Sequence, residues 1–153
     1  EQKPVVTEFK PSVDVASLTD FVLQNEMVRD AAFIQHNIDT KQYIVADARA
    51  SERFHGLAAE PRPGVRSGHI PNAVNLPFGQ VMDDICYKSP ESLHEIFSNF
   101  SEDLTQPFVF SCGSGVTGCI ILVAAIVSGR HNVSLYDGSW SEWGSNPALP
   151  IEQ

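Results

Sequence analysis

The chain has 153 residues, of which 42% are hydrophobic, and this is the length and composition of a chain that folds around one core. Its formal net charge is −9, and its 10 Lys and Arg residues form no run, which argues against a nucleic-acid partner. The longest apolar run, residues 119–127, is about half the length that a membrane span needs, so we expect no membrane partner and a single domain over residues 1–153.

Short apolar runs alternate with stretches of helical periodicity along the first half of the chain. The pattern predicts strands over 4–6 and 43–47, with a helix over 15–28 between them. Residues 50–68 are rich in Pro, Gly and Arg, and we expect a long surface loop with a short helical turn there. A further short strand is predicted over 73–76.

The second half of the chain continues this alternation. It predicts helices over 77–82, 91–100 and 116–128, and strands over 108–110 and 133–136. Alternating strands and helices favour an α/β fold, in which a parallel sheet carries helices on both faces.

In a parallel sheet of this kind, ligands bind beyond the carboxyl ends of the strands. Three loops are therefore candidates for a site, namely those that follow Asp47, Ser111 and Tyr136. We expect side chains from these loops to meet at one edge of the sheet.

The loop after the predicted strand over 108–110 is the most informative segment. The strand leads directly into Cys112, a Gly/Ser/Thr loop follows, and an apolar helix begins near Val116. Gly113 and Gly115 allow successive backbone N–H groups to point inward, and the helix adds the positive end of its dipole. A thiolate in this setting has a lowered pKa and is nucleophilic, which predicts a catalytic role for Cys112. The alternative is a small buried cysteine before a glycine-rich turn, and the context of strand, loop and helix favours the catalytic role.

Cysteine phosphatases also place a cysteine in such a loop. They require an arginine at the sixth position after it, where the guanidinium grips phosphate. The residue at that position here is Gly118, and Ser114 stands where a charged residue could have been. The residues themselves therefore disfavour a phosphatase.

Four segments of the chain resemble signatures of the rhodanese family and, within it, of the 3-mercaptopyruvate sulfurtransferases. Residues 112–117, Cys-Gly-Ser-Gly-Val-Thr, are similar to the active-site loop of these enzymes, whereas thiosulfate-preferring relatives carry basic residues after the cysteine. The other three segments resemble a strand end, a Gly-His-Ile-Pro signature and the end of the catalytic domain, and they lie at 45–50, 68–77 and 136–143. All four occur in the order of the family over about residues 43–143, which makes the resemblance specific.

The resemblance implies an α/β, rhodanese-like fold with a five-stranded parallel sheet flanked by helices on both faces. It implies that Cys112 carries sulfur as a persulfide, and that Arg53 and Arg62 hold the carboxylate and keto oxygen of the substrate. The alternative for the two arginines is ordinary pairing with Glu52 and Glu60 on a solvated loop. Further contacts to the substrate are expected from the residues that follow the cysteine: Gly113, Gly115, Val116 and Thr117.

Several other polar residues of these segments are open to two interpretations. The hydroxyl of Ser114 could bind the substrate or relay a proton, which would place it beside Cys112 among the catalytic residues, or Ser114 could simply suit a tight turn. For Asp47, Arg49 and His69 we expect structural roles.

The activity that the resemblance implies is transfer of sulfane sulfur from 3-mercaptopyruvate, a small anionic donor, to cyanide or to a thiol acceptor such as thioredoxin, with release of pyruvate. No metal or organic cofactor is expected. Enzymes of this kind usually carry two rhodanese-like domains with the site at their interface, and this chain resembles only the second, so a first domain upstream is an expected partner. Two alternatives stay open: a thiosulfate sulfurtransferase, and a persulfide carrier or binding module that needs a partner domain for turnover.

The cysteines and histidines indicate neither a disulfide framework nor a zinc site. Cys86, Cys112 and Cys119 are an odd number without a Cys-x-x-Cys pair, and the five histidines lack the spacing of metal ligands. Free cysteines favour a reducing compartment, so we expect the cytoplasm, with the mitochondrion as the alternative. Cys119 is expected to be packed and Cys86 exposed. Because the chain begins at Glu1 without an initiator Met, we expect a processed product or an excised piece of a longer protein.

Overall fold

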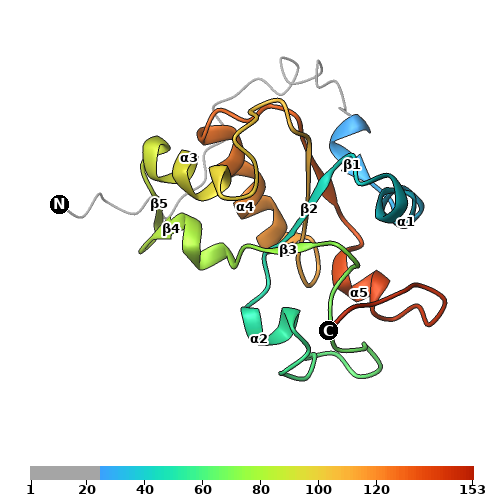
Figure 1. Ribbon diagram of the computed structural model, residues 1–153. Coiled ribbons are helices and arrows are strands. Elements are labelled where there is room, and N and C mark those ends of the chain that lie inside the picture. The colour runs from blue at the N-terminus through green and yellow to red at the C-terminus, as the bar shows by residue number, and fades with distance from the viewer. Residues whose placement is uncertain (1–24) are drawn as a thin grey trace, which may run out of the picture.

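The computed structural model describes residues 25–153, and Figure 1 shows how its helices and strands are arranged. In chain order the elements are η2 (Asn25–Met27), β1 (Val28–Arg29), α1 (Ala31–Thr40), β2 (Ile44–Asp47), α2 (Ser51–Phe54), β3 (Val74–Asn75), η3 (Phe78–Val81), β4 (Met82–Asp83), β5 (Cys86–Tyr87), α3 (Pro90–Ser98), β6 (Phe108–Ser111), α4 (Val116–Val127), β7 (Val133–Tyr136) and α5 (Ser139–Trp143). The predicted strand over 4–6 and most of the predicted helix over 15–28 lie outside the described residues.

Five strands form one sheet in the order β1-β7-β6-β2-β3, and all neighbouring strands in it are parallel. The central register places Ala46 beside Phe110 and Asp47 beside Ser111, so that β2 and β6 end together. A separate antiparallel pair, β4 with β5, forms a small hairpin. The α/β fold with a five-stranded parallel sheet, expected from the resemblance, is therefore confirmed.

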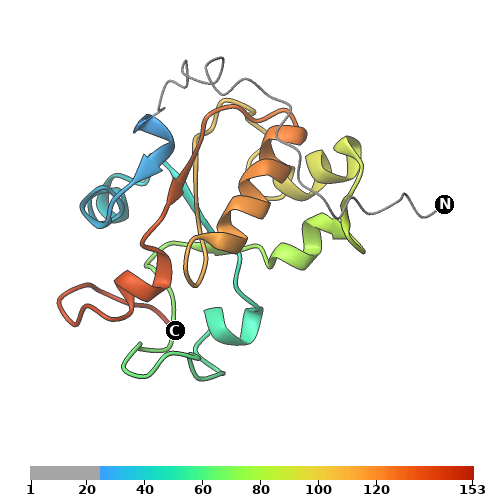
Figure 2. The same ribbon diagram turned by 180° about the vertical axis from the view of Figure 1, so that it is seen from behind.

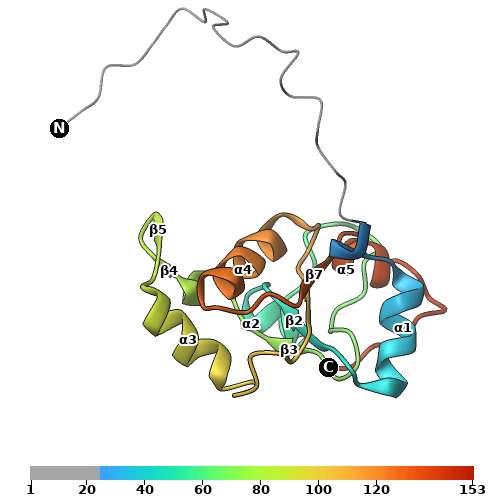
Figure 3. The same ribbon diagram turned by 90° about the horizontal axis from the view of Figure 1, so that it is seen from above.

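Helices cover both faces of the sheet, with α3 and α4 on one face and α1 and α5 on the other (Figures 2 and 3). The core follows from the alternation of side chains along the central strand β6. Phe108 and Phe110 pack with Ile121 of α4, whereas Val109 belongs to the cluster that contains Ile34 of α1. Both faces of the sheet are thus buried, which leaves the ends of its strands as the places where a functional site can form.

The helix predicted over 15–28 overlaps the described residues only at 25–28, and there the prediction is wrong. Asn25–Met27 form a short 3-10 turn and Val28–Arg29 form an edge strand. Val28 pairs with Leu135 of β7, and this backbone pairing overrides a weak helical spacing.

Helix α1 has no counterpart among the predicted elements. Asp30 caps its N-terminus, since the carboxylate accepts the N–H of Phe33 at 2.8 Å. Its inward face includes Asn37, whose side-chain amide binds both backbone groups of Tyr43 at 2.9 Å. A buried polar residue at an inward position interrupts the apolar periodicity by which a helix is predicted.

The predicted helix over 77–82 is also shorter than expected. Its centre forms a 3-10 turn, η3, and Met82 then enters the β4–β5 hairpin by pairing with Tyr87. The remaining predicted helices and strands of residues 25–153 are observed, with ends that differ by at most two residues.

The apolar helix α4 is buried on one side only. Val116, Val123 and Val127 are 70%, 40% and 41% exposed. Cys119 is also exposed, so the prediction that it is packed is wrong, whereas the prediction that Cys86 is exposed is confirmed. Across residues 25–153, no helix has both the length and the apolar character that crossing a membrane requires.

Candidate active site

The carboxyl ends of β2, β6 and β7 lie at the same edge of the sheet, and the three predicted loops meet there, between α2 and α5 (Figures 1 and 2). Backbone hydrogen bonds join these loops to one another. The Ala48 N–H donates to the Ser111 carbonyl at 2.9 Å, and the Trp140 N–H donates to the Cys112 carbonyl at 2.9 Å. The position of Cys112 is therefore set by three strands together.

Cys112 lies at the bottom of the loop between β6 and α4, with 1% of its surface exposed. Burial raises the pKa of its thiol, but hydrogen bonds from the Thr117 hydroxyl and from the backbone N–H groups of Ser114, Gly118 and Gly115 lower it, and the net pKa is below the ordinary value. The Ser114 nitrogen lies 3.4 Å from Sγ. Because the first turn of α4 supplies part of this cradle, the helix dipole also favours the nucleophilic thiolate.

Helix α5 holds the cysteine loop from the outside. The Ser139 hydroxyl accepts the Cys112 N–H at 3.2 Å, and the N–H groups of Trp140 and Ser141 donate to the carbonyls of Cys112 and Gly113 at 2.9 Å. These bonds turn the loop carbonyls toward α5 and leave the following N–H groups to face the sulfur. No pattern in the sequence indicated these roles, since a helix of five residues has no apolar repeat.

Two glycines of the loop are required by their surroundings. Gly115 has a φ of +87°, and a Cβ there would lie 3.0 Å from the carboxylate of Asp137. A Cβ on Gly113 would lie 3.2 Å from Nη2 of Arg53. The absence of a side chain at Gly113 therefore lets the Arg53 guanidinium approach the loop.

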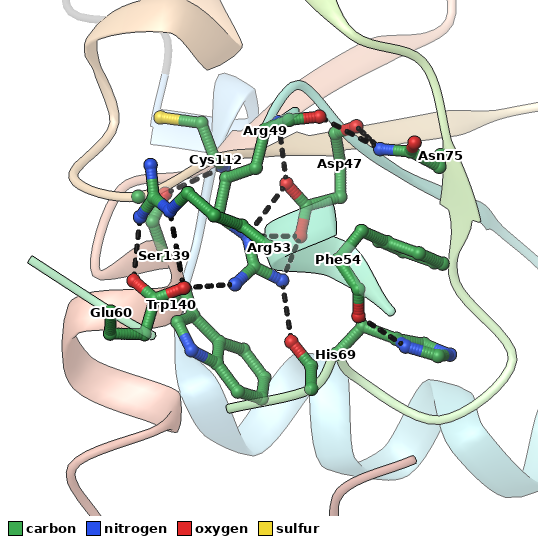
Figure 4. A network of polar contacts seen from close by, with 12 residues as sticks. Asp47, Arg49, Arg53, Phe54, Glu60, His69, Asn75, Cys112, Ser139 and Trp140 are labelled. Atoms are coloured by element: carbon green, nitrogen blue, oxygen red, sulfur yellow. Dashed lines mark hydrogen bonds and ion pairs between the residues drawn. The ribbon is translucent and has the colours of Figure 1, made fainter. Parts of the chain in front are cut away.

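Asp47 and Arg49 form a buried ion pair, in which Nη2 lies 2.7 Å from Oδ2 (Figure 4). Arg49 also donates to the Gly68 carbonyl at 2.8 Å, and its guanidinium lies 4.5 Å from the centre of the Trp140 ring. These contacts fix the chain after β2 to the segment before β3 and to α5, which confirms the expected structural roles of both residues.

Glu60 lies between the arginines, with 4% of its side chain exposed. It accepts a hydrogen bond from Nη1 of Arg49 at 2.9 Å, and two from Nε and Nη2 of Arg53 at 3.2 and 2.6 Å (Figure 4). The alternative in which Arg53 pairs with Glu60 is thus observed, but the pair is largely buried and stands against the cysteine loop. Arg53 is therefore a positioned guanidinium and not a solvated surface charge.

Arg62 is held in a different way. Its Nη1 donates to the Ser141 hydroxyl at 2.8 Å. Within residues 25–153, no carboxylate lies within 4.0 Å of its guanidinium, so its charge is not compensated by an ion pair. The pairing of Arg62 with Glu52 or Glu60 is not observed.

A cavity of about 170 Å³ brings the two arginines to the cysteine loop; we refer to it as the arginine cavity. Its lining consists of both arginines, residues that follow the cysteine, and neighbours from the loop after α2 and from α5: Arg53, Glu60, Pro61, Arg62, Val65, Gly113, Ser114 and Ser141. A small anion in this cavity would meet two guanidinium groups directly beside the segment that carries the nucleophile.

The remaining residues of the predicted site lie elsewhere around the loop. Gly115 and Thr117 contact the sulfur of Cys112 and do not line the cavity. Val116 is 70% exposed at the start of α4 and also lies outside the cavity lining. Ser114 is exposed and lines the cavity, and its backbone N–H, not its hydroxyl, is the group that binds Sγ.

The histidine of the Gly-His-Ile-Pro segment has a structural position. His69 is buried, its Nδ1 lies 2.9 Å from the Phe54 carbonyl, and its ring stacks on that of Phe54. In the described part of the chain, no group of His, Cys, Asp and Glu side chains is arranged to hold a metal ion.

Comparison with known proteins places this arrangement in a family. Residues 30–146 match the model of the rhodanese-like domain. The chain is 36% identical over 144 residues to human 3-mercaptopyruvate sulfurtransferase, covering 94% of this chain and 45% of the relative. It is 44% identical over 111 residues to the mouse protein of the same name, covering 72% of this chain and 37% of the relative.

A relative named thiosulfate sulfurtransferase is similarly close. The chain is 38% identical over 145 residues to rat thiosulfate sulfurtransferase, covering 94% of this chain and 48% of the relative. Among solved structures, the Tum1 protein from Saccharomyces cerevisiae matches with a TM-score of 0.74 and 34% identity, over 84% of this chain and 47% of that one. The chain therefore spans less than half the length of these relatives.

Proposed function

The chain belongs to the rhodanese-like domain family, and from this premise we propose that it is a sulfurtransferase that takes sulfur from 3-mercaptopyruvate onto Cys112. The observation that carries the proposal is the arginine cavity, which brings Arg53 and Arg62 beside the loop of a cysteine with a lowered pKa. The names of the relatives, which are mercaptopyruvate and thiosulfate sulfurtransferases, support the class of reaction.

In the first half-reaction, the Cys112 thiolate attacks the sulfur of 3-mercaptopyruvate. An Sγ–S bond forms, and the C–S bond breaks with its electron pair moving to carbon, so that the enolate of pyruvate leaves and then takes up a proton. The hydrogen of the substrate thiol stays on the outer sulfur as Cys112–S–SH. The reaction is balanced without a metal or an organic cofactor.

The arginines are suited to the charges that this step creates. The substrate carboxylate is a natural partner for the uncompensated guanidinium of Arg62. Arg53, already oriented by Glu60, can donate to the keto oxygen as it becomes an enolate. The cradle of N–H groups around Sγ favours the anion both before and after sulfur is bound.

In the second half-reaction, an acceptor thiolate or cyanide attacks the outer sulfur of the persulfide, and Cys112 leaves as the thiolate. We propose a small thiol or a thioredoxin-like protein as the acceptor. The exposed position of Ser114 at the mouth of the arginine cavity keeps its hydroxyl within the proposed site, as a group that binds substrate or relays the proton.

Thiosulfate is the second candidate donor. The similarity to rat thiosulfate sulfurtransferase favours it, whereas Gly113 and Ser114 argue against it, because they provide no positive charge beside the nucleophile for the sulfonate. A further alternative is a persulfide carrier that needs a partner domain for turnover, and the assay below distinguishes it from an enzyme.

The test is a side-by-side assay of pyruvate release from 3-mercaptopyruvate and of thiocyanate formation from thiosulfate and cyanide. We expect mercaptopyruvate turnover that falls by at least about a thousandfold in Cys112→Ser, because the nucleophile is lost. Cys86→Ser is the matched control, since Cys86 is an exposed cysteine outside the arginine cavity, and its activity should stay at the wild-type level.

Each outcome separates the candidates. Turnover that favours thiosulfate would assign the second donor. A folded chain that forms the persulfide when supplied with a donor but turns over neither substrate would be the carrier. Activity that survives in Cys112→Ser would contradict the proposed nucleophile.

A further inference from the structure

Ser141 links the second arginine to the cysteine loop. Its hydroxyl accepts from Nη1 of Arg62 at 2.8 Å and donates to the Gly113 carbonyl, to which its own N–H also donates at 2.9 Å. One side chain of α5 therefore joins a residue of the long loop after α2 to the residue that follows the nucleophile.

Arg62 depends on this contact more than Arg53 depends on any single bond. Arg53 makes two hydrogen bonds to a carboxylate that is itself almost fully buried. Arg62 lies on an exposed part of the chain, and its one side-chain hydrogen bond within residues 25–153 is the one to Ser141. A long side chain with a single partner loses its preferred orientation when that partner is removed.

The charges around the arginine cavity make the orientation of Arg62 consequential. Asp47 with Arg49 and Glu60 with Arg53 form ion pairs that cancel in formal charge. Arg62 is the remaining cation of the cavity lining, in a chain whose formal net charge is −9. An anion that enters the cavity is therefore attracted mainly by the group that Ser141 holds.

We propose that Ser141 is a positioning residue for anionic sulfur donors, which acts by holding the Arg62 guanidinium beside the cysteine loop. The remaining N–H groups of Arg62 are then directed to a carboxylate in the arginine cavity while the substrate sulfur meets Cys112. The inference rests on the proposed function, because it assigns how that site selects anions.

The experiment compares alkylation of Cys112 by iodoacetate, an anion, and by iodoacetamide, its neutral analogue, and so requires no sulfur transfer. In both reactions the thiolate displaces iodide and a C–S bond forms. Rates are followed by mass spectrometry of the Cys112 peptide, and Cys86, an exposed cysteine of β5, reports the reactivity of a thiol outside the cysteine loop. Ser141→Ala should lower the iodoacetate rate at Cys112 about five- to tenfold and leave the iodoacetamide rate within about twofold.

Two further variants complete the test. Ser141→Thr keeps the hydroxyl and should retain the preference for iodoacetate. In an Arg62→Gln background, which should itself lose that preference, Ser141→Ala should have no additional effect, because it acts through Arg62. Equal losses with both reagents, an undiminished effect without Arg62, or a rate ratio that Arg62→Gln does not change would overturn the proposal. Since alkylation does not depend on turnover, a failure of the proposed sulfur transfer would appear separately in the pyruvate assay.

Discussion

At the scale of single residues, Cys112 combines burial with an environment that favours its ionised form. Burial of a thiol ordinarily disfavours the thiolate, and here the hydroxyl of Thr117 and the loop N–H groups outweigh that effect. Cys119 of α4 is in the opposite situation, because partial burial and then the negative charges of Cys112 and Asp137 raise its pKa. The two cysteines therefore offer a comparison within one chain.

We predict that the pH dependence of alkylation by iodoacetamide distinguishes them. The thiolate is the reactive form, so a lowered pKa moves the half-maximal rate of Cys112 to a lower pH, and a raised pKa moves that of Cys119 to a higher pH. Thr117→Val should shift the Cys112 midpoint upward, since it removes the side-chain hydrogen bond, and Thr117→Ser should restore it. Equal midpoints for the two cysteines would contradict the role of the cradle.

Cys112 and both arginines of the arginine cavity were predicted from the sequence, whereas Ser139 and Ser141 were not. The strand, glycine loop and helix around Cys112 can be recognised in the sequence itself, and the roles of the two arginines were implied by the resemblance to the rhodanese family. Ser141 has no such pattern, because its hydroxyl contacts Arg62, which lies 79 positions away in the sequence, only after α5 has packed against the loop.

At the scale of elements, the loop after α2 is tied to the sheet by charge as much as by apolar packing. Glu60 accepts hydrogen bonds from Arg49, which follows β2, and from Arg53 of α2. The buried Arg49 is shared between this carboxylate and Asp47. Removing one member of such a cluster leaves a buried charge with fewer partners, which is more costly than losing a surface pair.

We predict that Glu60→Gln lowers the free energy of unfolding by about 2–4 kcal/mol, measured by urea denaturation. The amide cannot compensate the charges of Arg49 and Arg53, and its N–H₂ group faces further donors. Glu52→Gln on α2 is the matched control, because that residue is exposed, and it should change stability by less than about 0.5 kcal/mol. Similar midpoints of urea denaturation for the two variants would show that the hydrogen bonds of Glu60 with Arg49 and Arg53 contribute little to stability.

The elements that the sequence predicted are those with strong apolar periodicity, such as β2, β6 and α4. The elements that it missed depend on contacts between distant segments. β1 exists because Val28 pairs with Leu135, and α1 turns a polar residue, Asn37, toward Tyr43. The outward position of Cys119 was missed for a related reason, since composition alone does not show which side of an apolar helix faces solvent.

At the scale of the whole molecule, the parallel sheet determines where the chemistry lies. Alternating strands and helices were sufficient to predict the fold class and the edge at which the three loops meet, because the carboxyl ends of parallel strands share one edge. The same edge carries the uncompensated guanidinium of Arg62, in a chain with a formal net charge of −9. The chain nevertheless spans less than half the length of its relatives, so binding at this site and complete turnover are separate questions.

Whether the site binds an anionic substrate can be tested by a binding measurement on this chain. Pyruvate, the expected product, should bind the folded state at the arginine cavity and therefore raise the melting temperature. At a pyruvate concentration of about 100 times its Kd, the free energy of unfolding rises by about 2.7 kcal/mol. This corresponds to an increase in melting temperature of roughly 5–10 °C for a domain of this size. Arg62→Gln should abolish most of the shift, because it removes the uncompensated guanidinium, whereas Lys88→Gln removes a positive charge that does not line the cavity and should leave it intact. Ionic strength is matched by chloride. Equal shifts in both variants would indicate a general salt effect and would contradict a specific anion site. A shift that depends on Arg62, in a chain that does not turn over mercaptopyruvate, would show that the anion site forms in this chain and that turnover fails at a later step than binding.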